Sequence, residues 1–241
     1  MKGEPIASME VAPEELSSSL CAVRLCVPET QERMERSLSK LGQLTPVQAW
    51  RVGDALELFD GVKRWRAARA LSWKTLRVEV HALDATGAKV RLLSCNAASG
   101  LSELEVAWVV RSLYREDGLS QPQIARLLSR DKSWVSRKLT LAEGLCDELT
   151  AQVRLGLVCA RAAVELARLP RGNQDTAAKV VTRRGLTTRQ TARLVESLLS
   201  APLAEWPRLL AEVPKPVTTT EPKGGAPRRT PGEQMVADAL V

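Results

Sequence analysis

The sequence predicts an α+β N-terminal domain followed by an all-α domain that contains a helix-turn-helix. Alternating apolar runs separated by short turns occur between Ala22 and Leu83, whereas only helical spacing is found from Leu119 to Leu199. Aromatic residues make up 3% of the chain, so Leu, Val and Ala must fill its cores, and this composition favours helices. We therefore place a disordered tail at residues 1–19, the first domain at 20–100, the helical domain at 101–200, and a linker with a flexible tail at 201–241.

The elements of the first domain follow from local pattern and turn residues. Met1 to Ser19 mixes Pro, Glu and Ser without a period, which is typical of a loose tail. The turn Gly53-Asp54 between two apolar runs indicates a hairpin, and Asp60-Gly61 leads into a basic helix. We expect strands and helices, in order, at Ala22–Val27 (strand), Glu29–Lys40 (helix), Val47–Val52 and Ala55–Phe59 (hairpin), Val62–Leu71 (helix), Leu76–Leu83 (strand) and Ala85–Ala98 (helix).

The second domain and the end of the chain differ sharply in composition. A helix is expected over Leu104–Tyr114, and further helices follow as far as Leu199. Beyond them, Val213–Val217 and Glu221–Pro231 are rich in Pro or Gly, and such segments cannot bury enough apolar surface to become ordered. We therefore expect a linker there, with Met235–Val241 as a frayed terminus.

The excess of positive charge lies in the second domain. Residues 1–117 hold 16 basic and 16 acidic side chains, residues 118–200 hold 14 and 7, and residues 201–241 hold 5 and 5, for a net charge of +7. A clustered positive field attracts polyanions and releases their counterions on contact. Double-stranded DNA is therefore the first partner to expect, although a solvated basic helical surface would give the same count.

Composition also excludes several classes of protein. No stretch approaches the ~20 apolar residues that span a bilayer, and Met1 to Ser19 lacks the apolar core of a signal peptide. We therefore expect a cytoplasmic protein with no membrane contact. Five cysteines without a C-x-x-C pair, and one histidine at His81, indicate neither a disulfide framework nor a zinc site.

The segment from Leu119 to Leu128 has the pattern of the first helix of a helix-turn-helix. Ser120 is expected to cap this helix, and Pro122 to occupy its first turn, where the missing N–H costs nothing. Ala125 is small enough to let a second helix cross closely. The buried face of the first helix is expected to comprise Ile124, Leu127 and Leu128.

The second helix is predicted to present polar side chains outward. Ser129–Lys132 supplies the turn, Ser133 is expected to cap the helix, and Val135 and Leu139 point inward. Arg and Lys can bind guanine edges or phosphates, and Ser can take either role. The predicted DNA-binding residues are Ser120, Gln121, Lys132, Ser133, Ser136, Arg137 and Lys138. The alternative is an ordinary helical hairpin with a solvated basic face.

These motifs resemble those of the ParB-like partition protein family. Leu119–Leu169 and Gly185–Gln190 resemble its helix-turn-helix and supporting helices, while Gly42–Pro46 and Leu58–Ala67 resemble its G-x-x-Q-P and G-E-R-R-x-R-A segments. The resemblance runs from Ala22 to Ser200 in the order of the family. It implies a ParB/sulfiredoxin-like first domain and a homodimer that binds a centromere-like DNA site, binds CTP in that domain, and slides on DNA as a clamp.

The segment around Gly61 also has the chemistry of a phosphate site in its own right. A glycine before a helix allows close backbone approach, and the helix start offers free N–H groups beside basic side chains. The alternative is a basic helix that packs Trp65 and Ala68 on a sheet. With Thr45 and Pro46 near the base, as the resemblance implies, the predicted nucleotide-binding residues are Thr45, Pro46, Gly61, Lys63, Arg64, Arg66 and Asn96.

Two departures from the family pattern concern catalysis. Val62 stands where the family has Glu after the glycine, and Cys95 stands where its E-N-x-x-R segment begins. Mg²⁺ requires hard oxygen ligands, and hydrolysis requires a group that orients water. The loss of both carboxylates argues against Mg²⁺ as a cofactor and against efficient CTP hydrolysis, so we assign no catalytic residue.

We interpret the chain as a nucleoid-associated, sequence-specific DNA-binding protein that acts in plasmid or chromosome partition or as a regulator on a mobile element. The alternatives are a helix-turn-helix transcriptional regulator without nucleotide binding, and a nuclease or sulfiredoxin-like enzyme. The residue at position 62 argues against the enzyme alternative, because Val62 stands where a sulfiredoxin-like site requires cysteine. The C-terminal dimerisation domain usual in the family has no counterpart after Pro202, so the N-terminal domain or an unseen partner protein would have to supply the dimer.

Overall fold

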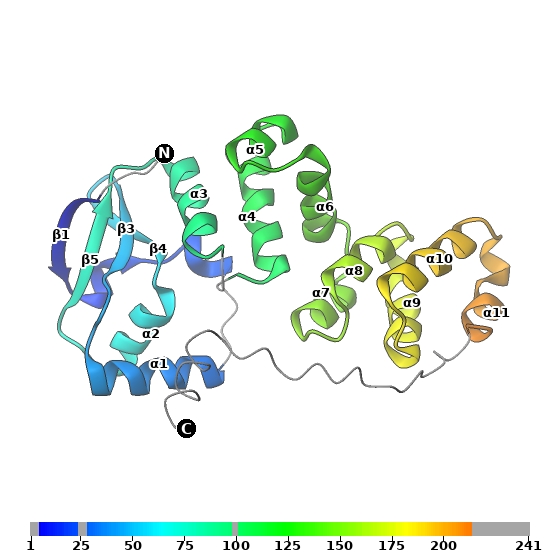
Figure 1. Ribbon diagram of the computed structural model, residues 1–241, viewed down its shortest axis with the longest axis horizontal. Helices are drawn as coiled ribbons and strands as arrows, with labels where there is room; N and C mark the ends of the chain where they lie inside the picture. The colour runs from blue at the N-terminus through cyan, green and yellow to red at the C-terminus, as the bar shows by residue number, and fades with distance from the viewer. Residues whose placement is uncertain (1–4, 24–27, 98–100, 214–241) are drawn as a thin grey trace, which may run out of the picture.

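The computed structural model describes residues 5–23, 28–97 and 101–213 (Figure 1). Within these residues, the N-terminal domain is built on a five-stranded sheet in the order β1-β5-β3-β4-β2. β1 is antiparallel to β5, β5 is parallel to β3, β3 is antiparallel to β4, and β4 is parallel to β2. The strands are β1 (Pro5–Val11), β2 (Leu16–Ser17), β3 (Val47–Val52), β4 (Ala55–Asp60) and β5 (Leu76–His81).

The predicted hairpin is confirmed as β3 and β4, and it distributes side chains to both faces of the sheet. Val52 pairs with Ala55 across the turn, where Gly53 adopts a left-handed φ of 58°. Successive side chains of a strand point to opposite faces. Leu58 therefore belongs to the core on one face, while the neighbouring Phe59 belongs to the core on the other.

Helices cover both faces of this sheet (Figure 1). α1 (Pro28–Leu41) and α2 (Val62–Ala70) pack against the face that carries Leu58, and α3 (Ala85–Cys95) packs against Phe59. Trp65 of α2 is 7% exposed, as expected for a residue that seals the helix onto the sheet. Its indole Nε1 donates a hydrogen bond of 2.7 Å to the carbonyl of Pro13.

The prediction of a disordered tail at residues 1–19 is wrong for the described residues from Pro5 onward. β1 pairs with β5 along its length, and Leu16 of β2 pairs with Leu56 of β4. All residues of β1 except Val11 are exposed, so the strand carries no apolar alternation that the sequence could reveal. An edge strand is held by backbone hydrogen bonds to its neighbour, which any composition without interior proline can make.

The strand predicted at Ala22–Val27 is wrong at its start. Leu20–Val23 forms a 3-10 turn, and residues 24–27 lie outside the described residues. The turn is fixed from the side by Cys21, which is buried and whose Sγ donates a hydrogen bond of 3.2 Å to the carbonyl of Leu58. Cys21 therefore packs on β4 without extending the sheet.

The second domain is helical throughout its described length, as predicted. α4 is its central helix: Val110 and Leu113 pack in one core with α5 and α6, while Leu104 and Ala107 pack in a second core with α8, α9 and α10. The helices are α4 (Glu103–Arg115), α5 (Gln121–Leu127), α6 (Lys132–Glu143), α7 (Asp147–Arg154), α8 (Ala160–Leu166), α9 (Arg171–Arg184), α10 (Thr188–Leu199) and α11 (Trp206–Ala211).

The predicted linker begins later than residue 201. Leu203–Glu205 forms a 3-10 turn, and α11 follows it. Trp206 is 5% exposed and belongs to the second core of the helical domain, and its Nε1 donates a hydrogen bond of 3.2 Å to the carbonyl of Ala201. Trp206, together with the partly buried Leu209, Leu210 and Val213, thus anchors a short segment whose composition had indicated a linker. Residues 214–241 lie outside the described residues.

The two domains meet where α3 packs on α4. Val109 of α4 shares an apolar core with Phe59 and Leu92 of the first domain. Beside this core, the ammonium of Lys89 lies 2.6 Å from a carboxylate oxygen of Asp117 and 3.4 Å from one of Glu116. The side chains of Lys89 and Asp117 are only 7% and 11% exposed, so this ion pair is largely removed from water.

Replacing Asp117 with Asn should lower the free energy of unfolding by about 3 kcal/mol, because it removes the closer partner of a buried ammonium. Glu116→Gln is the matched control: its side chain is 67% exposed, and it should cost less than about 1 kcal/mol. Urea unfolding of both variants measures the difference. Equal losses in the two variants would show that the Lys89–Asp117 pair does not hold the domains together.

Candidate nucleic-acid interface and anion pocket

The first helix of the predicted helix-turn-helix, α5, begins as the sequence indicates. The amide oxygen of Gln123 accepts hydrogen bonds from the backbone N–H and the hydroxyl of Ser120, at 2.8 and 2.6 Å. Ile124 and Ala125 are buried against α4 and α6. Leu127 is 42% exposed, so the prediction that it is buried is wrong. α5 ends at this residue, and the partly buried Leu128 packs on the core in its place.

The turn and the start of α6 differ from the prediction by two residues. Asp131, not Ser133, caps α6: its Oδ1 accepts hydrogen bonds from the backbone N–H of Trp134 and from the Ser133 hydroxyl, at 2.6 and 2.5 Å. These hydrogen bonds, with that of Ser133 the largest cause, hold the pKa of Asp131 below its usual range. A carboxylate at this position accepts hydrogen bonds from the free N–H groups at the start of the helix. Its negative charge also interacts favourably with the positive end of the helix dipole.

One face of α6 is exposed and polar. Val135 and Leu139 point into the core shared with α4 and α5, as predicted. The other predicted residues of α6, apart from Lys138, are exposed, and so is Ser120 before the start of α5, whereas Gln121 is half-buried. The exposed residues of α6 are Lys132, Ser133, Ser136 and Arg137.

Lys138 is the exception, and the prediction that it projects outward is wrong. It is 5% exposed, its ammonium is hydrogen-bonded to a carboxylate oxygen of Glu103, and it lies 5.4 Å from the ring centroid of Trp134. Residue 138 follows Val135 by three positions, which places both on the same side of the helix. The spacing from Val135 therefore indicates that residue 138 faces the core, whereas the charge of lysine suggested that it faces solvent.

Two further exposed cations of the helix-turn-helix were not identified from the sequence. Arg126 lies on α5, and Arg130 lies in the turn, where its guanidinium is 5.5 Å from the ring centroid of Trp134 on α6. Both residues belong to the basic segment 118–200, so the sequence showed their charge. The contact of Arg130 with α6 depends on the turn, where Ser129 takes a left-handed φ of 52°.

The second predicted site forms a pocket between β4, α2 and α3. Its volume is about 160 Å³, and its lining includes Gly61, which has a left-handed φ of 88° at the start of α2. A Cβ at this position would lie 2.8 Å from Cγ1 of Val47, so only glycine fits. The pocket is lined by Cys21, Met34, Phe59, Asp60, Gly61, Val62, Lys63, Arg64, Leu92 and Asn96.

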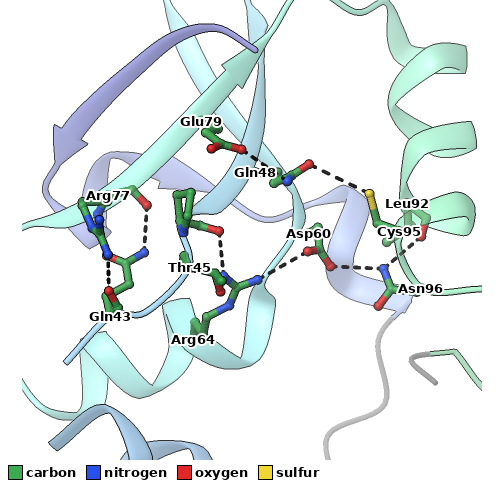
Figure 2. A network of polar contacts seen from close by, with 11 residues as sticks. Gln43, Thr45, Gln48, Asp60, Arg64, Arg77, Glu79, Leu92, Cys95 and Asn96 are labelled. Carbon is green, nitrogen blue, oxygen red and sulfur yellow. Dashed lines mark hydrogen bonds and ion pairs between the residues drawn. The ribbon is translucent and has the colours of Figure 1, made fainter. Parts of the chain in front are cut away.

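Figure 2 shows that Arg64 joins three elements around this pocket. Its Nη1 donates to the carbonyl and hydroxyl oxygens of Thr45, at 2.6 and 2.5 Å, and to the carbonyl of Pro46 at 2.6 Å. Its Nη2 donates to the carboxylate of Asp60 at 3.4 Å, and Asp60 accepts a further hydrogen bond of 3.1 Å from Asn96. Burial, the largest cause, lowers the pKa of Arg64, while the charge of Asp60 opposes the shift.

The predicted nucleotide-binding residues differ in whether they line the pocket. Gly61, Lys63, Arg64 and Asn96 line the pocket, while Thr45 and Pro46 reach it only through the guanidinium of Arg64. Arg66 does not line it, and its buried Nη1 has no hydrogen-bond partner among the described residues. Of the cations that line the pocket, Lys63 is the one whose side chain is not already bound to other groups of the described residues.

Of the two positions where the resemblance implies carboxylates, Val62 lines this pocket, and Cys95 directly precedes the lining residue Asn96. Val62 is 6% exposed in the first turn of α2, and the Sγ of Cys95 lies 3.9 Å from the amide oxygen of Gln48 (Figure 2). Burial, the largest cause, raises the pKa of the Cys95 thiol, which keeps it protonated. Across the described ranges there is no group of three His, Cys, Asp or Glu side chains suited to a metal ion, and no helix that could span a bilayer.

Two family models match the chain in the order of its domains. One, described as the ParB N-terminal domain, matches residues 2–97, and the other, the ParB HTH domain, matches residues 99–200. The chain belongs to the ParB family. The predicted fold class, an α+β domain of the ParB type followed by a helix-turn-helix domain, is thereby confirmed.

Relatives of this ParB-family chain differ in function and in length. A probable chromosome-partitioning protein ParB from Pseudomonas putida strain KT2440 is 28% identical over 215 residues, which are 88% of this chain and 69% of that protein. A nucleoid occlusion protein from Shouchella clausii is 29% identical over 101 residues, which are 42% of this chain and 36% of that protein.

A solved structure supports the fold. The C-terminally truncated chromosome-partitioning protein ParB from Caulobacter crescentus, in complex with the centromeric parS site, matches with a TM-score of 0.51 and 24% identity. The match covers 78% of this chain and 99% of that one. At this identity the similarity concerns the arrangement of helices and strands, so the chemistry of the present sites rests on the residues of this chain.

Proposed function

We propose that this ParB-family chain binds double-stranded DNA at a specific sequence and acts in the partition of a plasmid or chromosome. Membership of the family and the names of its relatives support the partition role. The chemistry of the exposed face of α6 supports the DNA-binding role. Because DNA is organised in the nucleoid, we expect the protein to be found there.

One observation carries the proposal: α6 is a capped helix that exposes Lys132, Ser133, Ser136 and Arg137 while its other side is buried. The major groove of B-DNA is wide enough for one α-helix, and its base edges offer acceptors that Lys and Arg can bind. The exposed Arg126 and Arg130 of the same helix-turn-helix would bind phosphates, which position the helix without reading sequence.

The direct test is selection of duplexes from a random library by the purified chain. The proposal predicts enrichment of one discrete motif, and footprinting should place α6 over its major groove. A motif with two half-sites, bound by two copies of the chain in native mass spectrometry, would identify the homodimer. Retention without enrichment of any motif would contradict sequence-specific binding.

A second candidate role is transcriptional regulation, which would use the same face of α6. The two roles predict different occupancy of the genome. Pull-down of cross-linked DNA should yield enrichment over kilobases around one site if the chain loads and spreads as a partition protein. A narrow peak near its own gene would instead identify a regulator.

The pocket at Gly61 supports a further proposal, that the N-terminal domain binds the phosphates of a nucleotide such as CTP. Gly61 lines the pocket at the start of α2, and Lys63 supplies a cation there. The volume of about 160 Å³ lies below the ~300–1,000 Å³ of pockets that enclose whole drug-sized ligands, so it suits the phosphates alone.

Calorimetric titration with CTP tests this pocket, with and without Mg²⁺. We expect measurable heat, and a roughly tenfold weaker binding in Lys63→Ala, because a charge-assisted hydrogen bond is lost. Arg69→Ala is the control, since this exposed arginine of α2 stacks on Trp65 and does not line the pocket. Equal weakening by the two variants, or no heat with CTP, would contradict nucleotide binding at this pocket.

A further inference from the structure

Lys138 and Glu103 connect the proposed reading helix to the helix that supports it. Glu103 is the first residue of α4, and its carboxylate accepts a hydrogen bond from the ammonium of Lys138 on α6. The Lys138 side chain is 6% exposed, whereas that of Glu103 is 69% exposed. Trp134, one turn before Lys138, covers the same ammonium at 5.4 Å.

The centre of the contact between α4 and α6 is apolar, and a second set of ion pairs joins Arg111 and Arg115 of α4 to Glu143, the last residue of α6. Val110 and Leu113 of α4 pack on Val135 and Leu139 of α6. Apolar burial is non-directional, so it tolerates small rotations of one helix on another. A charge-assisted hydrogen bond depends on the positions of both partners. Arg111 and Arg115 hold the last residue of α6, so the Lys138–Glu103 pair is the charged contact that orients the part of the helix next to Arg137.

The pair also removes Lys138 from the charges that face DNA. Its ammonium is neutralised by Glu103 and is almost fully buried, whereas the adjacent Arg137 is exposed. Lys138 therefore has no free charge with which to bind a phosphate. Its effect on DNA binding must act through the orientation of the side chains that do reach the groove.

We infer that Lys138 is a positioning residue, which, with Glu103, fixes the rotation of α6 on α4 and so sets how well the chain discriminates its DNA site from other duplexes. This inference rests on the proposed sequence-specific DNA binding. Hydrogen bonds to base edges require donors held within a fraction of an ångström, whereas phosphate contacts tolerate more displacement. Loss of the pair therefore weakens discrimination and leaves non-specific affinity intact.

The test compares affinities for two duplexes of equal composition, the motif selected by the wild-type chain and a scrambled version, at several salt concentrations. In Lys138→Met the ratio of the two affinities should fall about tenfold, comparable to a mismatched base pair. Affinity for the scrambled duplex and the salt dependence should stay as in the wild type. Glu103→Ala should lower the ratio likewise, and because it leaves the buried Lys138 ammonium without its partner, urea unfolding of this variant is measured beside its affinities.

The charge-swapped double variant, Glu103→Lys with Lys138→Glu, separates positioning from direct contact. It should restore the ratio to within about threefold of the wild type, because it re-forms the pair with the opposite polarity. A weaker salt dependence in Lys138→Met, by about 0.9 in slope, would show a phosphate contact and overturn the inference. An unchanged ratio of the two affinities in both single variants would show that the pair has only a structural role, and would contradict the inference. Failure of the wild-type chain to enrich any motif would refute the proposed function itself, and this inference with it.

Discussion

Replacing Lys132 and Arg137 together with Ala should weaken binding to the selected duplex by roughly thirtyfold or more, since groove contacts contribute at least about 1 kcal/mol each. Both side chains are exposed on α6, and neither packs in the core with Val135. The salt dependence should also become shallower, by about 0.9 for each phosphate contact that is lost. Fluorescence anisotropy at several salt concentrations measures both effects.

Arg208→Ala provides the matched control for this double variant. Arg208 is an exposed arginine of α11, which lies at the far end of the helical domain from α5 (Figure 1). Its loss removes a positive charge without touching the proposed interface, so the affinity should change less than twofold. An equal effect of the control, or no effect of the double variant, would show that α6 does not contact the DNA.

Trp206→Ala should lower the free energy of unfolding by about 3–5 kcal/mol, the usual cost of removing a buried aromatic side chain. Trp206 is 5% exposed and packs against the core of the helical domain, which extends this domain past the expected linker. Urea unfolding measures the loss. Leu203→Ala is the control, because Leu203 is 63% exposed and should cost within about 0.5 kcal/mol. Equal, small changes would place α11 outside the cooperative core.

The sequence predicted the elements whose signals are local. The hairpin of β3 and β4 follows from a turn glycine between two apolar runs, and α5 begins where Ser120 and Pro122 indicate. β1 and α11 were missed for a common reason. Each is held by the rest of the fold, β1 through backbone pairing with β5 and α11 through Trp206, and neither contact leaves a periodic pattern in the sequence.

The candidate sites show the same limit at the level of single side chains. The sequence identified Lys132 and Arg137 because exposed cations on a helix need only the helical period to be placed. It misplaced Lys138, because a partner 35 residues away in the chain, Glu103, compensates the buried charge. The nucleotide-binding role of Arg64 stays a prediction: the residue lines the pocket, and its guanidinium already binds three acceptors of Thr45 and Pro46.

The most direct measurement is a comparison of the base preferences of wild-type and Arg137→Ala chains, selected from the same random duplex library. If the exposed face of α6 reads the major groove, the wild type enriches one motif, and the variant loses preference at one or two positions while keeping the rest. An identical motif from both chains, or no motif from the wild type, would contradict the assignment of α6 as the reading helix.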